Sequence, residues 1–262
     1  MKICSIASGS SGNCIYVEDS KTKLLIDVGI SGKRVTNGLS QIGVDGRELD
    51  GILVTHDHED HIKGVGILSR KYDLPIYVNE GTWEVMKDSI GKIHPKNVKY
   101  FDSKIPFEIK DFRIEPFSIS HDAKDPVGFS IYGQNKKMSI ATDLGYINNN
   151  IFEKLYGADM VLLEANHDVQ MLKVGPYPYY LKRRILGEEG HLSNESAGNA
   201  LVHLVEKGLE QVLLAHLSKK NNFPELAYQT VYNILTDHKI KVEKDVRVDV
   251  AHRNSVSQVY CL

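Results

Sequence analysis

Residues 51–64 read GILVTHDHEDHIKG, where a short apolar run leads into six consecutive titratable side chains. The apolar run predicts a buried strand, because strands inside sheets read as short apolar segments between polar ones. His56 and His58 lie two residues apart in the extended loop that follows, so their rings point in the same direction. Asp60 and His61 then fall at the start of the next helix. The stretch therefore gathers imidazoles and carboxylates at one end of a strand.

Histidine nitrogen and carboxylate oxygen are the usual protein ligands of zinc, manganese and iron. A solvated, charged loop is the alternative interpretation, and it would be favoured for a lone histidine. The pattern His-x-His-x-Asp-His directly after a buried strand favours a metal site. Asp57 and Glu59 alternate with the candidate ligands, so they are predicted to point away, toward solvent or backbone donors.

One loop cannot complete a metal site, so further ligands are expected at the ends of other strands. His121, Asp143 and His216 each end an apolar run, as His56 does. The ends of neighbouring strands converge at one edge of a sheet. Asp27 also ends an apolar run, and we expect it to orient a ligand histidine rather than bind metal. Three other histidines lie in polar or helical surroundings and are predicted to be surface residues: His94, His203 and His238.

The chain has 262 residues, of which 42% are hydrophobic and 25% charged, so we expect a single domain over residues 1–262. Strands occur in two batches, each followed by alternating strands and helices. This order predicts an α/β fold, a four-layer αββα sandwich of two mixed β-sheets flanked by helices. Helices are expected near 62–72, 80–88, 193–208 and 223–238, and strands in the apolar runs between them, with closing strands at 246–251 and 255–261.

The bulk properties exclude some classes of protein and leave others open. The net charge of −2 gives no overall attraction to nucleic acid, so a nucleic-acid substrate would need a local site. No apolar run reaches the roughly 18 residues of a membrane span, and no signal peptide is evident at the start. The three cysteines are scattered and odd in number, which predicts reduced thiols in a cytoplasmic protein: Cys4, Cys14 and Cys261.

The histidine motif with His121, Asp143 and His216, preceded by LLIDVG, resembles the motif set of the metallo-β-lactamase superfamily. The resemblance implies the αββα fold and two divalent metal ions, Zn²⁺ or Mn²⁺, with iron also possible. By position, it implies that one ion is held by His56, His58, His121 and Asp143. The other would be held by Asp60, His61, Asp143 and His216. A hydroxide bridging the two ions would be the nucleophile, oriented by Asp60. The acidic residues in the motif disfavour β-lactam hydrolysis.

Glu164, at the end of VLLE, and His191, in GHLSN, resemble a pair in the tRNA 3′-processing nucleases of this superfamily. That resemblance implies that Glu164 orients His191, and that His191 binds phosphate or acts as general acid. A carboxylate partner favours the protonated imidazole, which suits both roles. The alternative is that His191 is a surface or capping residue in the loop before a helix.

Five stretches together resemble the bacterial YycJ/WalJ-type proteins: ASGSSGN, THDHEDH, EANHD, GHLSN and AHLSKKNN. This resemblance implies a cytoplasmic, metal-dependent 5′-to-3′ DNA exonuclease. Polar residues in these loops are candidate substrate contacts, although plain turns and solvated loops are the alternative: Ser8, Ser10, Ser11, Asn13, Ser193, Ser218, Lys219, Asn221 and Asn222. The stretch GPYPYYLKRR (175–184) can form a substrate wall of tyrosines and cations, or simply a proline-bounded loop leading into an amphipathic turn.

Other functions stay open at this stage. A phosphodiesterase for small molecules, such as cyclic phosphates or nucleotides, needs the same metal site. A thioester hydrolase of the glyoxalase II kind is disfavoured, because the pair of Glu164 and His191 fits phosphate chemistry better. A binding module without activity is disfavoured by the complete set of candidate ligands. The sequence leaves the oligomeric state open.

Overall fold

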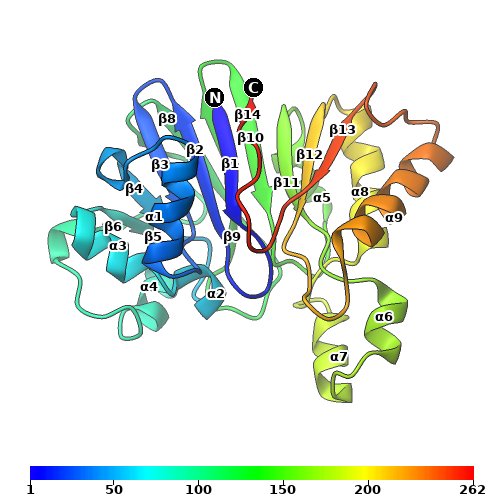
Figure 1. Cartoon of the computed structure of the whole chain (residues 1–262), viewed down its shortest axis with the longest axis horizontal. Helices are drawn as coiled ribbons and strands as arrows, with labels where there is room; N and C mark the ends of the chain where they lie inside the picture. Colours follow the sequence, from blue (N-terminus) through cyan, green and yellow to red (C-terminus); the bar gives the residue numbers. More distant parts are fainter.

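The computed structural model describes residues 1–262 and contains two seven-stranded sheets, which stand face to face in Figure 1. The first sheet has the strand order β14 (Tyr260–Cys261), β1 (Lys2–Ala7), β2 (Cys14–Asp19), β3 (Thr22–Ile26), β4 (Gly51–Leu53), β5 (Ile76–Val78) and β6 (Val98–Tyr100). The second has the order β13 (Arg247–Val250), β12 (Gln211–Ala215), β11 (Met160–Glu164), β10 (Lys136–Ala141), β9 (Val127–Gly133), β8 (Phe112–Ser118) and β7 (Phe107–Ile109).

Both sheets are mixed in the same way. Strands β14, β1, β2 and β3 pair antiparallel, and β3 to β6 pair parallel. In the second sheet β7 to β10 pair antiparallel and β10 to β13 pair parallel. The parallel strands β11 and β12 are buried almost throughout, as expected for strands covered on both faces. Their carboxyl ends meet at one edge of the sandwich.

Three apolar clusters fill the space between four layers. One lies between the sheets and joins residues such as Ile26 and Leu53 to Phe129 and Leu162. Another packs the first sheet against α1 (Gly32–Gln41), α3 (Val65–Tyr72) and α4 (Glu80–Met86). The third packs the second sheet against α5 (Asn149–Leu155), α8 (Asn194–Glu206) and α9 (Pro224–Asp237). The predicted αββα sandwich is confirmed. No helix has both the length and the apolar character needed to cross a membrane.

Several local expectations need correction. The helix expected near 62–72 is divided into α2 (Glu59–Ile62) and α3, because the Gly64 amide donates to the Val28 carbonyl instead of continuing a helix. Helix α1 was not expected, since its sequence holds two glycines. Gly38 serves close packing, because a Cβ there would lie 2.5 Å from a methyl of Ile6. The closing strand expected at 255–261 is limited to the two residues of β14. Helices α5, α6 (Val169–Val174) and α7 (Tyr179–Ile185) were not expected either.

Candidate metal centre

The candidate ligands follow strand ends, and three of the site residues have left-handed backbone conformations. Asp27 after β3, Asp143 after β10 and His216 after β12 have φ of 56°, 61° and 57°. Non-glycine residues pay free energy for positive φ, and such residues cluster at functional sites. The strained conformations turn these side chains across the sheet edge, where the two sheets face each other.

Three histidines form one group. The rings of His56, His58 and His121 lie with centroids 4.8, 5.1 and 4.9 Å apart. His58 directly precedes α2 without capping it through its side chain, and the short loop places its ring beside His56, as the spacing predicted. Asp57 and Glu59 point away from this group, because Asp57 accepts from the Lys124 amide and Glu59 pairs with a neighbouring lysine at 3.1 Å.

A second group lies beside the first and holds two carboxylates. His216 Nε2 is 3.4 Å from Asp60 Oδ2, and His61 Nε2 is 3.8 Å from the same oxygen. Asp143 stands between the groups, with Oδ2 3.3 Å from His61 Nε2 and Oδ1 3.9 Å from His121 Nε2. In each group that includes these residues, the ligand-type atoms lie within 4.8 Å of one another.

Two buried polar atoms in this cluster lack a hydrogen-bond partner: Nε2 of His56 and Oδ2 of Asp143. An unpaired buried polar group costs about 1–3 kcal/mol, so native proteins rarely leave one without a reason. Apart from its contact with His61, Asp143 Oδ2 has no neighbour that relieves this cost. Imidazole nitrogens and carboxylate oxygens converging with unused lone pairs suit a divalent cation. The residues present therefore fit a metal site.

Asp27 lies behind the cluster and accepts three hydrogen bonds. Its Oδ2 accepts from His61 Nδ1 at 2.8 Å and from the Thr55 hydroxyl at 2.8 Å, while Oδ1 accepts from the Thr55 amide. This arrangement turns His61 Nε2 toward Asp143. A carboxylate behind a histidine fixes the tautomer and orientation that metal binding requires. The position agrees with the orienting role expected for Asp27.

Glu164 is completely buried and serves two histidines at once. Its Oε1 lies 2.8 Å from His191 Nδ1 and 2.7 Å from His216 Nδ1. Its Oε2 accepts from the amides of Leu144 and Leu192, each at 3.1 Å. Four donors occupy the carboxylate, so Glu164 has little capacity left to bind a cation. The sequence suggested a partner for His191 alone, and the structure adds His216 to the same carboxylate.

The charges in the site control which histidines hold protons. Burial lowers the pKa of His56 well below its usual value, and the neighbouring His61 adds to the effect. Burial also opposes the charge on His216, but the carboxylates of Asp143 and Asp60 outweigh it and raise that pKa to about 10. His56 therefore offers a free lone pair. His216 carries a proton that a bound cation must displace.

Glu164 and His191 favour each other's charged forms in this arrangement. Burial would raise the pKa of Glu164, but the charge and hydrogen bond of His191 outweigh it and lower the pKa to about 2. Burial likewise opposes the charge on His191, yet the Glu164 carboxylate raises its pKa above the usual value. The His191 side chain keeps 19% of its surface exposed. At the rim of the cluster, an imidazole whose protonated form is favoured therefore reaches the solvent.

Most of the polar residues suggested as substrate contacts are buried and bonded within the chain. Ser8 accepts from the His216 amide, and Asn13 contacts His61 Nε2 at 3.1 Å. Ser193 caps α8 through the Ser196 amide, as predicted. The others with buried side chains are Ser218, Asn221 and Asn222. These six support the loops that carry the site. Of the nine candidates, only three have exposed side chains free to meet a substrate: Ser10, Ser11 and Lys219.

Sequence reasoning did not find Asp122, and it expected Arg184 only as a cation of the stretch 175–184. Asp122 Oδ1 lies 3.7 Å from His58 Nε2 and 3.6 Å from His121 Nε2, and it has no hydrogen-bond partner. Its other oxygen accepts from Arg184 Nε on α7. The position of Asp122 directly after His121 was an available signal. The contact of Arg184 with Asp122 had no signal in the sequence, because it depends on where α7 packs.

Comparison with known proteins places the chain in a family. A family model described as "Beta-lactamase superfamily domain" matches residues 22–217. The chain belongs to this superfamily. It is 42% identical to "Exodeoxyribonuclease WalJ" of Streptococcus pneumoniae over 93% of this chain and 91% of that protein. It is also 42% identical to "Exodeoxyribonuclease YycJ" of Bacillus anthracis, over 88% of each chain.

A solved structure shares the fold. The metallo-β-lactamase fold protein YhfI from Bacillus subtilis superposes with a TM-score of 0.73 over 98% of this chain and 99% of that one, at 17% identity. The predicted membership in the metallo-β-lactamase superfamily, in its YycJ/WalJ-type branch, is confirmed. The histidine and aspartate clusters of this fold suit a metal site.

Proposed function

We propose that the protein is a metal-dependent phosphodiesterase that degrades nucleic acid as an exonuclease, acting on DNA in the 5′-to-3′ direction. The observation that carries the phosphodiesterase assignment is the carboxylate of Glu164, shared between His191 and His216. It couples a charged imidazole at the rim to a candidate ligand in the cluster. The relatives at 42% identity bear the name exodeoxyribonuclease, which supports DNA as the substrate.

The metal ligands would be the two groups described above. His56, His58, His121 and Asp143 would hold one cation, and Asp60, His61, Asp143 and His216 the other. When bound, two divalent cations supply an activated water at neutral pH and neutralise charge on the phosphate. Zn²⁺ and Mn²⁺ suit this nitrogen and oxygen donor set, and Fe²⁺ is a further candidate.

His191 would hold the scissile phosphate or protonate the leaving oxygen. Its Nδ1 donates to Glu164, and its Nε2 makes no hydrogen bond within the chain. A protonated imidazole with one free N–H can donate to a phosphoryl oxygen. Glu164 keeps this proton in place, because ionised Glu164 favours the charged ring. His191 and Asp143 also lie close enough to share a cation, so metal content is the measurement that separates the two roles.

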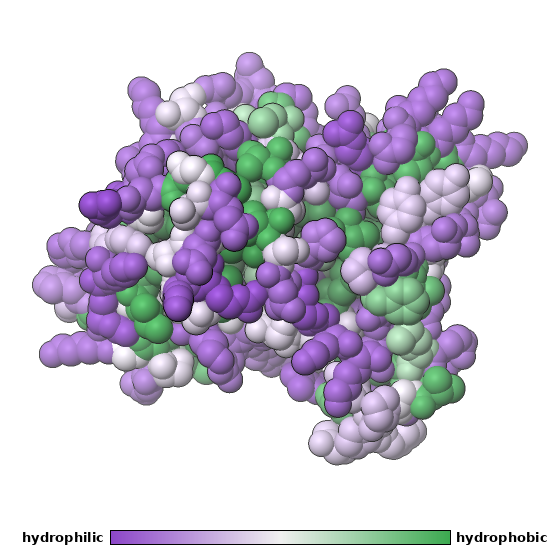
Figure 2. Space-filling model, viewed as in Figure 1, coloured by the Kyte–Doolittle hydropathy of each residue, from purple (hydrophilic) through white to green (hydrophobic).

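A basic and aromatic projection beside the site supports a strand-like substrate. Helices α6 and α7 form an arm that projects from the sandwich below the sheets in Figure 1. Figure 2 shows apolar and weakly polar side chains gathered on this projection. Tyr179 and Tyr180 are 76% and 74% exposed, and the last turn of α7 carries Lys182, Arg183 and Arg184. Exposed aromatic rings can stack on bases while cations meet phosphates.

The arm is connected directly to the candidate site. The Ile185 carbonyl at the end of α7 accepts from the His191 amide at 3.0 Å, and Arg184 bonds Asp122 next to His58. The stretch 175–184 was expected to be a wall or a proline-bounded loop, and its second half is the helix α7. A strand lying along this arm would run into the rim where His191 stands.

The assay that tests this function uses duplex DNA labelled at either the 5′ or the 3′ end, with Mn²⁺ or Zn²⁺ added. We expect metal-dependent release of mononucleotides from the 5′ end of DNA, and slower release from RNA. Cleavage of bis-p-nitrophenyl phosphate or a cyclic phosphate without action on nucleic acid would instead indicate a small-molecule phosphodiesterase. Hydrolysis of a glutathione thioester would contradict phosphodiester chemistry.

The cellular location proposed is the cytoplasm. All three cysteines are free, and Cys4 and Cys14 are buried in the first sheet. Reduced thiols are typical of cytoplasmic proteins, which supports this location.

A further inference from the structure

A half-buried arginine without an acidic partner lies beside the candidate metal centre. Arg253 Nη2 donates to the Leu217 carbonyl at 2.6 Å, and Nη1 donates to the Ser11 hydroxyl at 3.4 Å. Arg253 makes no ion pair, in contrast to Arg113, Arg184 and Arg247, which each pair with a carboxylate. A guanidinium partly withdrawn from water without a counter-ion is unfavourable. The charge of Arg253 is therefore not neutralised by a carboxylate of the chain and is available to an anion.

The loop 8–13 next to this arginine is tied at both ends to candidate metal ligands. Ser8 Oγ accepts from the amide of His216 at 2.8 Å. At the other end Asn13 contacts His61 Nε2 at 3.1 Å, and its side chain also accepts from the Gly9 amide. The tip of the loop is thereby held at a defined place next to the cluster.

Glycine at position 9 makes room for the guanidinium. A Cβ there would lie 2.9 Å from Arg253 Nη1 and 3.0 Å from the Leu217 oxygen, and Gly9 has φ of +144°. Any other residue would push the guanidinium off the loop and strain the backbone. Glycine at position 9 is therefore needed for the close approach of Arg253 as well as for the turn.

The tip of the loop offers unused donors next to the guanidinium. The side chains of Ser10 and Ser11 are exposed, and the Ser10 amide makes no hydrogen bond within the chain. Arg34 donates to the Arg253 carbonyl at 3.3 Å, and it also has no carboxylate partner. The guanidinium contacts the Ser11 hydroxyl, and the neighbouring Ser10 adds a free amide and a second hydroxyl at the tip of the loop. Such a set matches the oxygens of a phosphate.

We propose that Arg253 and the tip of the loop 8–13 bind the terminal phosphate of a nucleic-acid strand. This inference rests on the proposed exonuclease function, since it names the end group that the same site takes. A phosphomonoester carries about −1.5 to −2 charges and three acceptor oxygens, more than an internal phosphodiester. A donor-rich, uncompensated site distinguishes these two anions. The enzyme would therefore select 5′-phosphorylated ends over 5′-hydroxyl ends.

The experiment measures binding and degradation of oligonucleotides that differ only in the 5′ end. Fluorescence anisotropy in EDTA gives the affinity for 5′-phosphate and 5′-hydroxyl DNA without metal or turnover, and exonuclease rates with Mn²⁺ give the second readout. The variants are Arg253→Gln, which can keep a hydrogen bond to Leu217, and Ser11→Ala. Arg247→Gln is the matched control, because Arg247 lies on β13 and pairs with Glu243.

We expect the wild type to bind the phosphorylated end about tenfold or more tightly, as a charge-assisted contact predicts. Arg253→Gln should reduce this ratio to near one, Ser11→Ala should reduce it partly, and Arg247→Gln should leave it unchanged. The ratio is an internal control, because partial unfolding lowers both affinities together. Equal affinity of the wild type for both ends, or an unchanged ratio in Arg253→Gln, would overturn the inference while exonuclease activity stands. A wild type that neither binds nor degrades DNA would overturn both proposals.

Discussion

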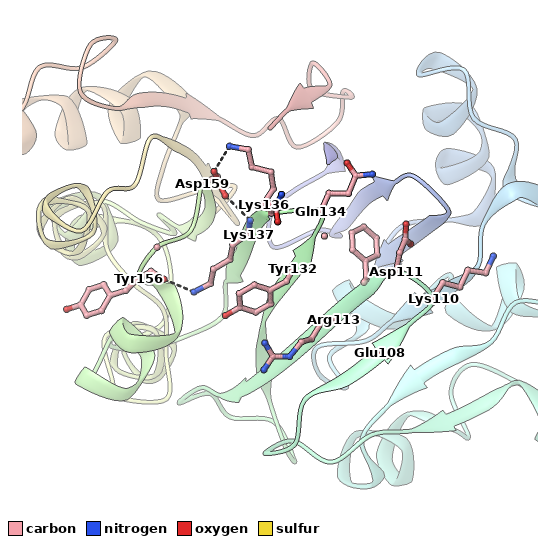
Figure 3. A pocket seen from close by; sticks show the side chains of 14 residues that line it. Glu108, Lys110, Asp111, Arg113, Tyr132, Gln134, Lys136, Lys137, Tyr156 and Asp159 are labelled. Carbon is pink, nitrogen blue, oxygen red and sulfur yellow. Dashed lines mark hydrogen bonds and ion pairs between the residues drawn. The ribbon is translucent and has the colours of Figure 1, made fainter.

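The two ends of the sheets differ in whether their polar and charged side chains find partners within the chain. At the end away from the candidate metal centre, a hollow runs along the starts of β8 and β10, and Figure 3 shows Lys136 joined to Asp159 and Lys137 joined to Tyr156. Lys136 pairs with Asp159 at 2.6 Å, and the Lys137 ammonium donates to the Tyr156 carbonyl at 2.6 Å. At the metal end, His56 and Asp143 keep buried atoms unpaired. Charges paired within the chain complete a surface, whereas buried atoms without a partner have lone pairs that suit a ligand.

Left-handed backbone occurs at both ends, for different reasons. Gln134 and Asn135, with φ of 50° and 100°, form the tight turn between β9 and β10. Such hairpin turns favour positive φ because it matches the strand twist. Asp143 and His216 make no hairpin, and buried contacts with other site residues hold them in place. Positive φ therefore serves to reverse the chain at the end with the hairpin. At the metal end it serves to position the side chains of the site.

The largest effect should follow from removing a candidate ligand at the metal end. We expect His58→Ala to abolish metal-dependent activity, because even the orienting partners of ligands cost about 10- to 100-fold when lost. Activity on labelled DNA and metal content by elemental analysis are the two measurements. His238→Ala, at an exposed histidine that follows the last residue of α9, is the control. Wild-type activity in His58→Ala would remove the metal assignment.

Replacing His191 at the rim should slow turnover without reducing the metal content of the protein. We expect His191→Ala to lower kcat about a hundredfold, as loss of a general acid or phosphate contact does. Metal content should stay at the wild-type level, because Glu164 still holds His216. Loss of metal in this variant would show that His191 is a ligand rather than a group that acts on the phosphate.

Weakening the support behind the cluster should have a smaller effect. In Asp27→Asn the charge facing His61 Nδ1 is lost, and we expect metal affinity to fall about 10- to 100-fold. Competition with a chelating dye measures this affinity. Asp57→Asn, in the same region but directed at the Lys124 amide, is the matched control. Equal affinities for the two variants would mean that Asp27 does not orient a ligand.

Metal affinity should rise with pH. The pKa of His216 is raised to about 10, so at pH 7 the metal-free protein holds a proton there that binding must displace. Raising the pH toward 10 removes this competition, which strengthens binding by up to about tenfold per pH unit. Calorimetric titration in two buffers of different protonation enthalpy counts the released protons. An affinity that is constant from pH 6 to 9 would contradict this protonation state.

The smallest effect is expected at the paired end. Lys136→Ala removes an ion pair whose side chains are 40% and 23% exposed. Pairs of this kind contribute about 0–1 kcal/mol to the free energy of unfolding, so thermal unfolding should barely change. Activity on DNA should equal that of the wild type. A large loss of activity would show that the two ends are coupled, and the contrast drawn between them would fail.

Local sequence reasoning succeeded where one stretch carries the signal. The run before His56 and the alternation through His61 predicted both the strand end and the start of α2. It failed for α1, where two glycines hide an amphipathic pattern with Val35 and Leu39 on the buried face, and for α7, which is mostly exposed. It also failed for the polar loop residues. The sequence around a serine or asparagine beside a candidate ligand does not show whether its side chain faces solvent or bonds the backbone. Ser8 and Asn13 prove to be supports.

The sequence by itself indicated the candidate ligand types, their order and the family, because the candidates lie in short motifs after apolar strands and need no distant information to be recognised. Only the tertiary structure decided which side chains from different strand ends form hydrogen bonds with the same partner. Glu164 serves both His191 and His216 because β11 and β12 pair side by side, with Glu164 opposite Ala215 in the register. Arg253 reaches the loop 8–13 because the C-terminal segment returns to pair β14 with β1. Contacts between residues more than two hundred positions apart depend on chain topology, which no local pattern records.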